Sequence, residues 1–159
     1  MYLAKVGLLQ LMRDLPGEKL TTLGVKKEVV DEGKEVAAKD ALMVERILQD
    51  KTVKVEKITD KKLFQIFSAI PELHETDAEV LTLAKERDGM AITDDKVARE
   101  TAKIYGIEYG GTAFILALLI RHGMITKETA KSALNDMISL GWRCSAEEYS
   151  HIVKMIDEI

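Results

Sequence analysis

The segment from Ala91 to Ile107 constrains the fold of this chain more than any other. An apolar strand ends on Thr93, and two carboxylates, Asp94 and Asp95, stand where the next helix begins. A strand that leads directly into a helix is the repeating unit of an open α/β sheet, whose chemistry lies at the carboxyl ends of the strands. Adjacent acids there can direct oxygen atoms toward a hard divalent cation. Metal-dependent phosphate chemistry is therefore our leading hypothesis.

Length and composition favour a single domain over residues 1–159. Of the 159 residues, 47% are hydrophobic, which is enough to form one core. The chain is too short for two domains to be expected. The single cysteine, Cys144, excludes an internal disulfide framework. Because the sequence shows no signal-peptide pattern and no apolar run long enough to cross a bilayer, we expect a cytoplasmic protein without a membrane segment.

The formal net charge of −4 argues against a general nucleic-acid coat protein, because binding through counterion release requires clustered lysine and arginine. It does not exclude a nuclease, since the carboxylates of a metal site raise the acidic count. A local group of basic residues, Lys96, Arg99 and Lys103, could still contact a phosphate backbone.

Apolar periodicity predicts strands that alternate with helices along the chain. Strands are expected at residues 20–23, 53–58, 89–93 and 107–109. Helices are expected at residues 2–15, 25–30, 36–48, 63–70, 77–87, 97–105, 113–120, 126–140 and 145–159. This alternation implies an α/β fold with a parallel sheet covered by helices on both faces.

The acids after the third predicted strand also have a structural interpretation, because aspartate is favoured at helix N-caps and in first turns. Only one residue is needed as a cap, and Asp95 can pair with Arg99 one turn later. This leaves Asp94 without an obvious structural duty, so Asp94 is our first candidate metal ligand.

Two earlier acids are further candidates. Asp77 opens the helix that precedes the acidic strand, where it suits the helix dipole and could also reach Asp94. Glu28 lies at the flank of an apolar stripe and can point inward, although an ordinary solvated glutamate also fits this position. Glu32 is an equally acidic neighbour, and periodicity cannot choose between the two glutamates.

Other polar residues have local explanations. Thr76 and Glu79 match a capping box, which accounts for Glu79 without a function. Thr112 follows a Gly-Gly pair and could either cap its helix or donate its hydroxyl to a phosphate. Ser145 and Glu148 are expected to cap the last helix. The three histidines share no spacing typical of a zinc site.

Several segments together match one known family. They are YLAKVGLLQLM, VKKEVVDEG, TDAEVLTLAKE, ITDDKVARETAKIYGI, GGTAFILALL and MITKETAKSALNDMISLGWRCSAEEY. Over nearly its whole length the chain resembles a PIN domain, specifically the compact prokaryotic branch related to VapC-type toxin nucleases. The resemblance implies a three-layer α/β/α fold with a short parallel sheet and C-terminal helices. It also implies a ribonuclease whose acids bind Mg²⁺ or Mn²⁺ at the carboxyl edge of that sheet.

The resemblance also implies roles for particular residues. The catalytic, metal-binding acids would be Glu28, Asp77 and Asp94, with Asp95 as an auxiliary ligand. Asp77 stands where relatives often carry glutamate, so its reach is one methylene shorter and a bridging water would complete the contact. The residues that would hold a substrate phosphate are Lys96, Arg99 and Thr112. A metal ion there would polarise the phosphate and activate a water for in-line attack.

The chain departs from the family at its start. Family members begin with a strand that carries the first metal-binding aspartate, and this strand precedes the helix that here begins near Tyr2. We therefore expect that the strand is missing from the sequence as given, that another segment fills its place, or that catalysis has been lost. The alternative function is thus a catalytically inactive PIN-like module that binds RNA or a protein. The resemblance further implies a toxin that pairs with a small antitoxin protein and forms homodimers.

Overall fold

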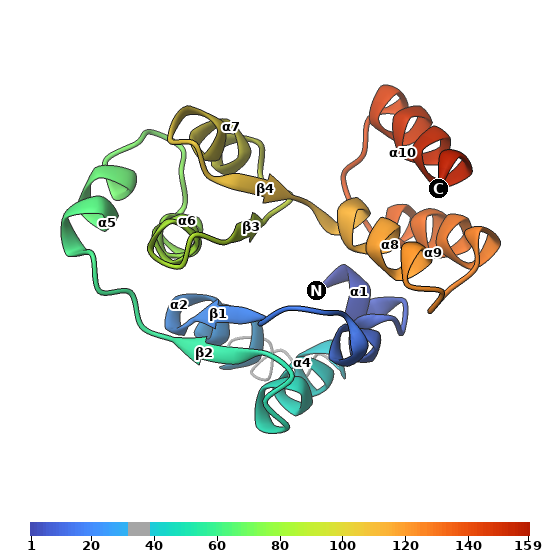
Figure 1. Ribbon diagram of the computed structural model, residues 1–159, viewed down its shortest axis with the longest axis horizontal. Helices are drawn as coiled ribbons and strands as arrows, with labels where there is room; N and C mark the ends of the chain where they lie inside the picture. The colour runs from blue at the N-terminus through green and yellow to red at the C-terminus, as the bar shows by residue number, and fades with distance from the viewer. Residues whose placement is uncertain (32–38) are drawn as a thin grey trace. The chain divides into compact units, whose positions relative to one another are not determined.

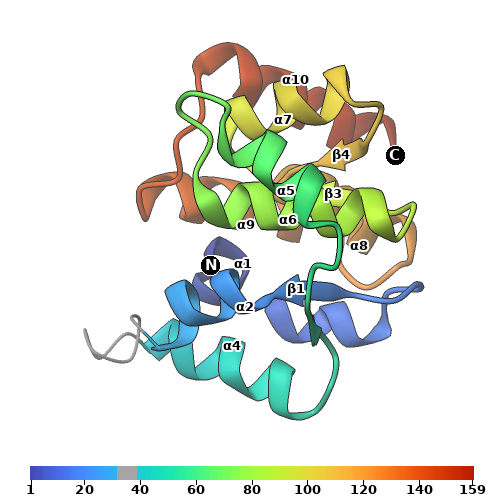
Figure 2. The ribbon, with the colours of Figure 1, turned by 90° about the vertical axis from the view of Figure 1, so that its left-hand side faces the viewer.

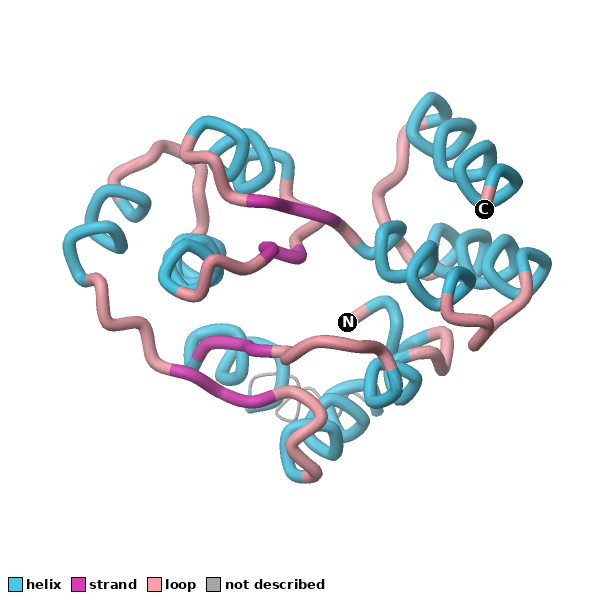
Figure 3. The backbone as a smooth tube through the Cα atoms, viewed as in Figure 1, coloured by secondary structure: helices cyan, strands magenta, loops and turns pink. Residues whose placement is uncertain are grey.

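The computed structural model describes residues 1–31 and 39–159 and shows a mixed α/β protein with short strands among many helices (Figures 1 and 3). The predicted fold class is therefore confirmed. The chain forms two compact units: one is Glu18–Gly111, and the other combines Met1–Gly17 with Thr112–Ile159. No helix in the described ranges is both long and apolar enough to span a membrane.

The unit Glu18–Gly111 contains two pairs of parallel strands. In the first pair, β1 (Leu20–Thr22) lies beside β2 (Lys54–Glu56), and in the second, β3 (Met90–Ile92) lies beside β4 (Glu108–Gly110). The strands of each pair are separated in sequence by helical segments, as parallel neighbours require, because a tight turn cannot join them. The expected parallel pairing is thus present, as two separate two-stranded pairs in the described part of the chain.

The described residues of this unit also form six helical segments. They are α2 (Leu23–Lys26), η2 (Lys27–Asp31), α4 (Lys39–Gln49), α5 (Lys61–Ser68), α6 (Glu75–Glu86) and α7 (Lys96–Ile104). The segment η2 is a π-helix that continues α2. The helix predicted at 36–48 is present as α4, and residues 36–38 of that prediction lie outside the described residues.

Helix α6 lies at the centre of this unit. It contacts β1 and α2 on one side of the unit and β3 and α7 on the other (Figures 1 and 2). Its buried residues Ala78, Leu81 and Ala84 form a core cluster with small side chains of β3 and α7, including Ala91 and Ala98. Because alanine side chains are short, the helix and strand backbones can approach closely at the point where the candidate acids lie.

An aromatic pair closes the far end of the same cluster. Phe67 of α5 is fully buried, and its ring meets the ring of Tyr105 edge to face, with 4.8 Å between the centroids. Such an arrangement adds to the free energy gained by burying the rings.

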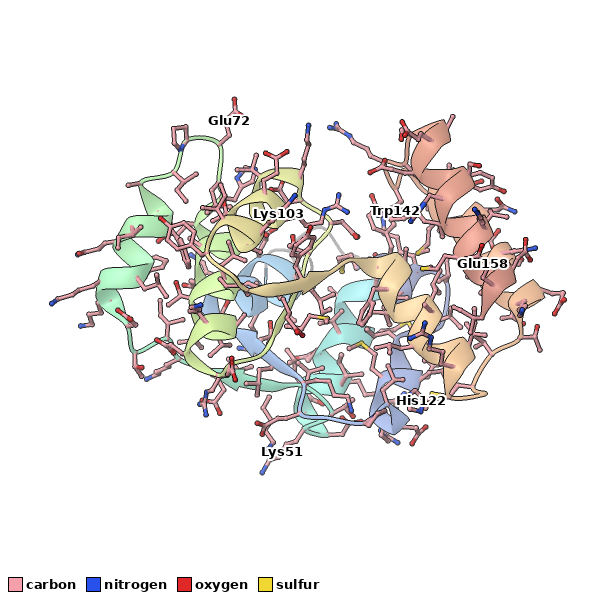
Figure 4. The ribbon with its side chains drawn as sticks, turned by 45° about the horizontal axis from the view of Figure 1, so that its top comes forward. Lys51, Glu72, Lys103, His122, Trp142 and Glu158 are labelled. Atoms are coloured by element: carbon pink, nitrogen blue, oxygen red, sulfur yellow. The ribbon has the colours of Figure 1, made fainter. Side chains whose placement is uncertain are left out.

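The turns around this unit are exposed, and at Lys51 and Glu72 the backbone is left-handed while the side chains point outward (Figure 4).

The second unit is helical. Its elements are α1 (Tyr2–Lys5), the 3-10 helix η1 (Leu9–Asp14), α8 (Thr112–Arg121), α9 (Lys127–Ser139) and α10 (Ala146–Glu158). Helix α8 packs against α9 and α10, and α1 packs against α9. Ile115, Leu116 and Leu119 of α8 are buried, as expected for an apolar core helix.

Two sequence predictions about this unit have opposite outcomes. The single helix predicted at residues 2–15 is wrong, because Gly7 adopts a left-handed conformation with φ +72° and the chain resumes as a 3-10 helix. The predicted cap of the last helix is confirmed, since Ser145 and Glu148 form a capping box at the start of α10.

We predict that Phe67→Ala lowers the free energy of unfolding by about 3–5 kcal/mol, because the variant leaves a cavity where a fully buried aromatic ring was. Urea denaturation measures this loss. The adjacent Ile66 is 50% exposed and serves as the control, so Ile66→Ala should change stability little. Equal losses in the two variants would contradict the placement of Phe67 in the core.

Candidate functional site

One hydroxyl group joins the acid of α6 to the acidic turn after β3. The Thr93 Oγ1 donates to Asp77 Oδ1 at 3.1 Å and accepts a hydrogen bond from the Asp95 backbone N–H, also at 3.1 Å. A hydroxyl has one proton to donate and lone pairs with which to accept, so both bonds are satisfied together. The Thr93 N–H also donates to Gly110 O at 2.8 Å, which fixes the turn to the end of β4.

The Asp77 carboxyl lies in an unfavourable environment for its charge. Burial raises its pKa above the ordinary value; the Thr93 hydrogen bond lowers it, the charge of Asp95 raises it, His74 lowers it and Glu28 raises it. The dominant cause is the loss of solvent around the carboxylate. The side chains of Asp95 and Glu28 act on Asp77 as like charges, so these three candidate acids share one electrostatic environment.

Asp95 is the N-cap of α7, which agrees with the expectation that either Asp94 or Asp95 caps this helix. Its Oδ1 accepts from the Ala98 N–H at 2.8 Å. The expected partner of Asp95, Arg99, instead donates from Nη2 to the backbone oxygen of Asp94 at 3.0 Å. The sequence left open which of the two acids caps the helix, and the structure gives this role to Asp95, whereas Arg99 contacts the backbone of Asp94.

The exposed side chain of Asp94 lies against the glycine that follows β4. A Cβ atom built on Gly111 would stand only 2.5 Å from Asp94 Oδ1 and 3.4 Å from the Thr93 carbonyl oxygen. Side chains essentially never approach that closely, so the position of this carboxylate depends on the missing Cβ. Nothing in the sequence pattern beyond the Gly-Gly pair indicated this contact.

The local explanation for Glu79 is wrong. Helix α6 begins at Glu75, two residues earlier than a capping box with Thr76 as N-cap requires, and its N-cap is His74. The Glu79 Oε2 instead accepts a hydrogen bond from the Gly24 N–H in α2, at 2.9 Å. The Thr76–Glu79 spacing is typical of a capping box within one helix, but Glu79 instead contacts α2, which lies far away in sequence.

The remaining predicted residues lie as follows. Glu28 is exposed in η2, and Glu32 lies outside the described residues. Lys96, in the first turn of α7, is largely exposed and lies 3.8 Å from the carboxylate of Glu100 one turn later. Thr112 is the first residue of α8 and belongs to the other compact unit.

The candidate acids Glu28, Asp77, Asp94 and Asp95 suit a hard divalent cation, because carboxylate oxygens are the ligands that Mg²⁺ and Mn²⁺ prefer. A cation would also offset the repulsion that Asp95 and Glu28 exert on Asp77. In the two described ranges, no three His, Cys, Asp or Glu side chains are gathered closely enough to hold a metal ion. The structure therefore shows electrostatically coupled acids rather than an assembled coordination sphere.

The sequence was compared with known families, curated proteins and solved structures. The comparisons with curated proteins and with solved structures gave no match. A family model described as PIN domain matches residues 1–158, which is nearly the whole chain. The resemblance noted from the motifs is thereby confirmed at the level of the family, and this chain belongs to the PIN domain family.

Proposed function

We propose that this protein is a divalent-metal-dependent ribonuclease that hydrolyses RNA phosphodiester bonds. Membership of the PIN domain family supports a function of the nuclease type. The observation that carries the metal-dependent part is Asp77, whose carboxyl is partly buried and lies within the electrostatic influence of Asp95 and Glu28. A carboxyl whose charged form is disfavoured by burial and by neighbouring acids is typical of a functional site.

In this proposal Glu28, Asp77 and Asp94 hold Mg²⁺ or Mn²⁺, with Asp95 as an auxiliary ligand. When bound, the metal ion lowers the pKa of a water molecule and polarises the phosphate. The chain's own contribution is to hold Asp77 and Asp94 near the carboxyl end of β3: Thr93 orients Asp77, and the missing Cβ of Gly111 leaves room for Asp94. No side-chain nucleophile is needed for hydrolysis by water.

Lys96, Arg99 and Thr112 are the proposed contacts for the substrate phosphate. Lys96 lies in the first turn of α7 and is extended into solvent, where it can approach a polyanion. Arg99 lies one turn further along α7, and its guanidinium reaches the backbone of Asp94. The relation to VapC-type toxins, an antitoxin partner and a homodimer are further proposals that depend on the sequence resemblance alone.

We predict that Asp94→Asn lowers Mn²⁺-dependent cleavage of single-stranded RNA about 100-fold or more, the order of loss seen when a charge-stabilising group is removed. The fold should be preserved, because Asp94 is exposed and asparagine has nearly the same size. Glu100→Gln, an exposed acid on the same turn-and-helix segment, is the control and should keep its activity. Unchanged cleavage by purified Asp94→Asn would remove Asp94 from the mechanism.

We predict that Asp77→Asn loses cleavage without losing stability at neutral pH. The folded state raises the pKa of Asp77, so it binds this proton more tightly than the unfolded chain does. Wild-type stability should therefore fall as the pH rises from the ordinary aspartate pKa through the raised one. Asparagine removes that loss and can still accept from Thr93. Urea denaturation at acidic and neutral pH measures the difference, and a marked destabilisation at neutral pH would contradict this assignment.

We predict that Gly111→Ala also impairs cleavage, because the new Cβ would displace the Asp94 carboxylate or the turn that carries it. Gly89→Ala is the matched control, since its Cβ would meet nothing closer than 3.9 Å and its φ is not left-handed. Cleavage assays on both variants, with circular dichroism to check folding, make the comparison. Full activity in Gly111→Ala would show that the position of Asp94 is unimportant.

Metal titration by calorimetry separates the nuclease from the alternative function. Specific Mn²⁺ binding that is lost in Asp77→Asn and Asp94→Asn supports the proposed site. A wild-type protein that binds RNA but no Mn²⁺ would instead support a catalytically inactive PIN-like binding module.

A further inference from the structure

The contact between Glu79 and Gly24 joins α6, which carries Asp77, to α2, which continues into the η2 segment that carries Glu28. The Glu79 Oε2 accepts from the Gly24 N–H at 2.9 Å, and the glutamate is partly buried. Gly24 lies in the first turn of α2, where backbone N–H groups have no partner within the helix. The next amide, that of Val25, donates to Thr22 Oγ1 at 3.3 Å. Glu79 therefore supplies, from another helix, part of the cap of α2.

The Glu79 carboxylate approaches Gly24 so closely that it could not keep its place beside a Cβ at this position. A Cβ on Gly24 would stand 2.7 Å from Glu79 Oε2 and 3.1 Å from Oε1, so a larger residue would displace the carboxylate. The conformation of Gly24 does not itself demand glycine, because its φ is not left-handed. The space occupied by Glu79 is the reason that a glycine fits here.

The positions of Asp77 and Glu79 on α6 explain what this contact does. Two residues along an α-helix correspond to a rotation of about 200°, so the two side chains leave α6 on nearly opposite sides. Asp77 reaches Thr93 after β3, and Glu79 reaches Gly24 in α2. One turn of α6 therefore fixes both the acidic turn with Asp95 and the helical segment that continues to Glu28.

We infer that Glu79 is a positioning residue, whose carboxylate holds the α2–η2 segment against α6 and so sets the place of Glu28 relative to Asp77. The inference rests on the proposed function, because the place of Glu28 matters only if these acids bind a metal ion together. Glu79 itself does not act on the substrate in this account. Its contribution is the location of α2, and an amide oxygen could replace its carboxylate.

The test measures Mn²⁺ affinity by calorimetry in the full-length chain. Glu79→Gln keeps an oxygen that accepts from Gly24 and should bind Mn²⁺ much as the wild type does. Glu79→Ala loses the contact and should bind Mn²⁺ about 10-fold more weakly or worse, the scale on which outer-shell partners act. Gly24→Ala should be similarly weakened, and adding Glu79→Ala to it should cause no further loss, because the displaced carboxylate is then absent.

Glu86 provides a matched control on the same helix. Its Oε1 accepts from the Thr59 N–H at 2.7 Å, from Thr59 Oγ1 at 3.2 Å and from the Asp60 N–H, so it also ties α6 to a neighbouring segment. That segment carries none of the candidate acids. Glu86→Ala should therefore lower stability as Glu79→Ala does, while leaving the Mn²⁺ affinity unchanged. Hydrogen exchange at the Gly24 amide should accelerate in Glu79→Ala alone.

The outcomes separate this inference from the proposed function. A wild-type protein without specific Mn²⁺ binding overturns the proposed function and the positioning role with it. Wild-type binding that is equally strong in Glu79→Ala overturns the positioning role alone. Equal weakening by Glu86→Ala and Glu79→Ala also overturns it, because the effect would then follow general stability. Weakening in Glu79→Ala that Glu79→Gln restores supports it.

Discussion

The candidate site depends on the hydroxyl of Thr93, which is hydrogen-bonded both to Asp77 and to the backbone of Asp95. Through its two hydrogen bonds, a single atom connects the first turn of α6 with the turn that follows β3. The hydrogen bond from Thr93 orients the Asp77 carboxyl, whose pKa is raised by burial and by the charges of Asp95 and Glu28. Small side chains that pack between α6, β3 and α7 also hold the start of α6 close to the end of β3. Hydrogen bonding and close packing thus act together to keep a charge in an unfavourable place.

The sequence predicted features that depend on neighbours along the chain. The alternation of strands and helices, the apolar core helix α8 and the cap of α10 all follow from local periodicity and first-turn chemistry. The two capping-box patterns show the limit of such reasoning. Ser145 and Glu148 form the capping box of α10. Glu79 does not cap α6, because this helix begins before Thr76 and the Gly24 N–H of another helix is available as a partner.

The candidate site was predictable in part for the same reason. That one of the two acids after β3 caps the next helix, and that Asp77 lies close to the end of β3, follow from the order of helix and strand. The roles of Thr93, Gly24 and Gly111 do not, since each depends on a contact made only after folding. A threonine before two aspartates, and glycines near strand ends, are common enough that spacing alone assigns them no partner.

The division of the chain into two units has a consequence for folding order. The unit Glu18–Gly111 is continuous, so all its contacts can form once that stretch has been synthesised. The other unit draws on both ends of the chain, and α1 finds its partner α9 only after the whole intervening unit has emerged. Closing so long a loop is entropically costly, and it is least costly when the intervening residues have already become compact. During synthesis α1 can pack only against the neighbouring η1 until α9 has emerged, which leaves part of its apolar surface open to misassembly in the meantime.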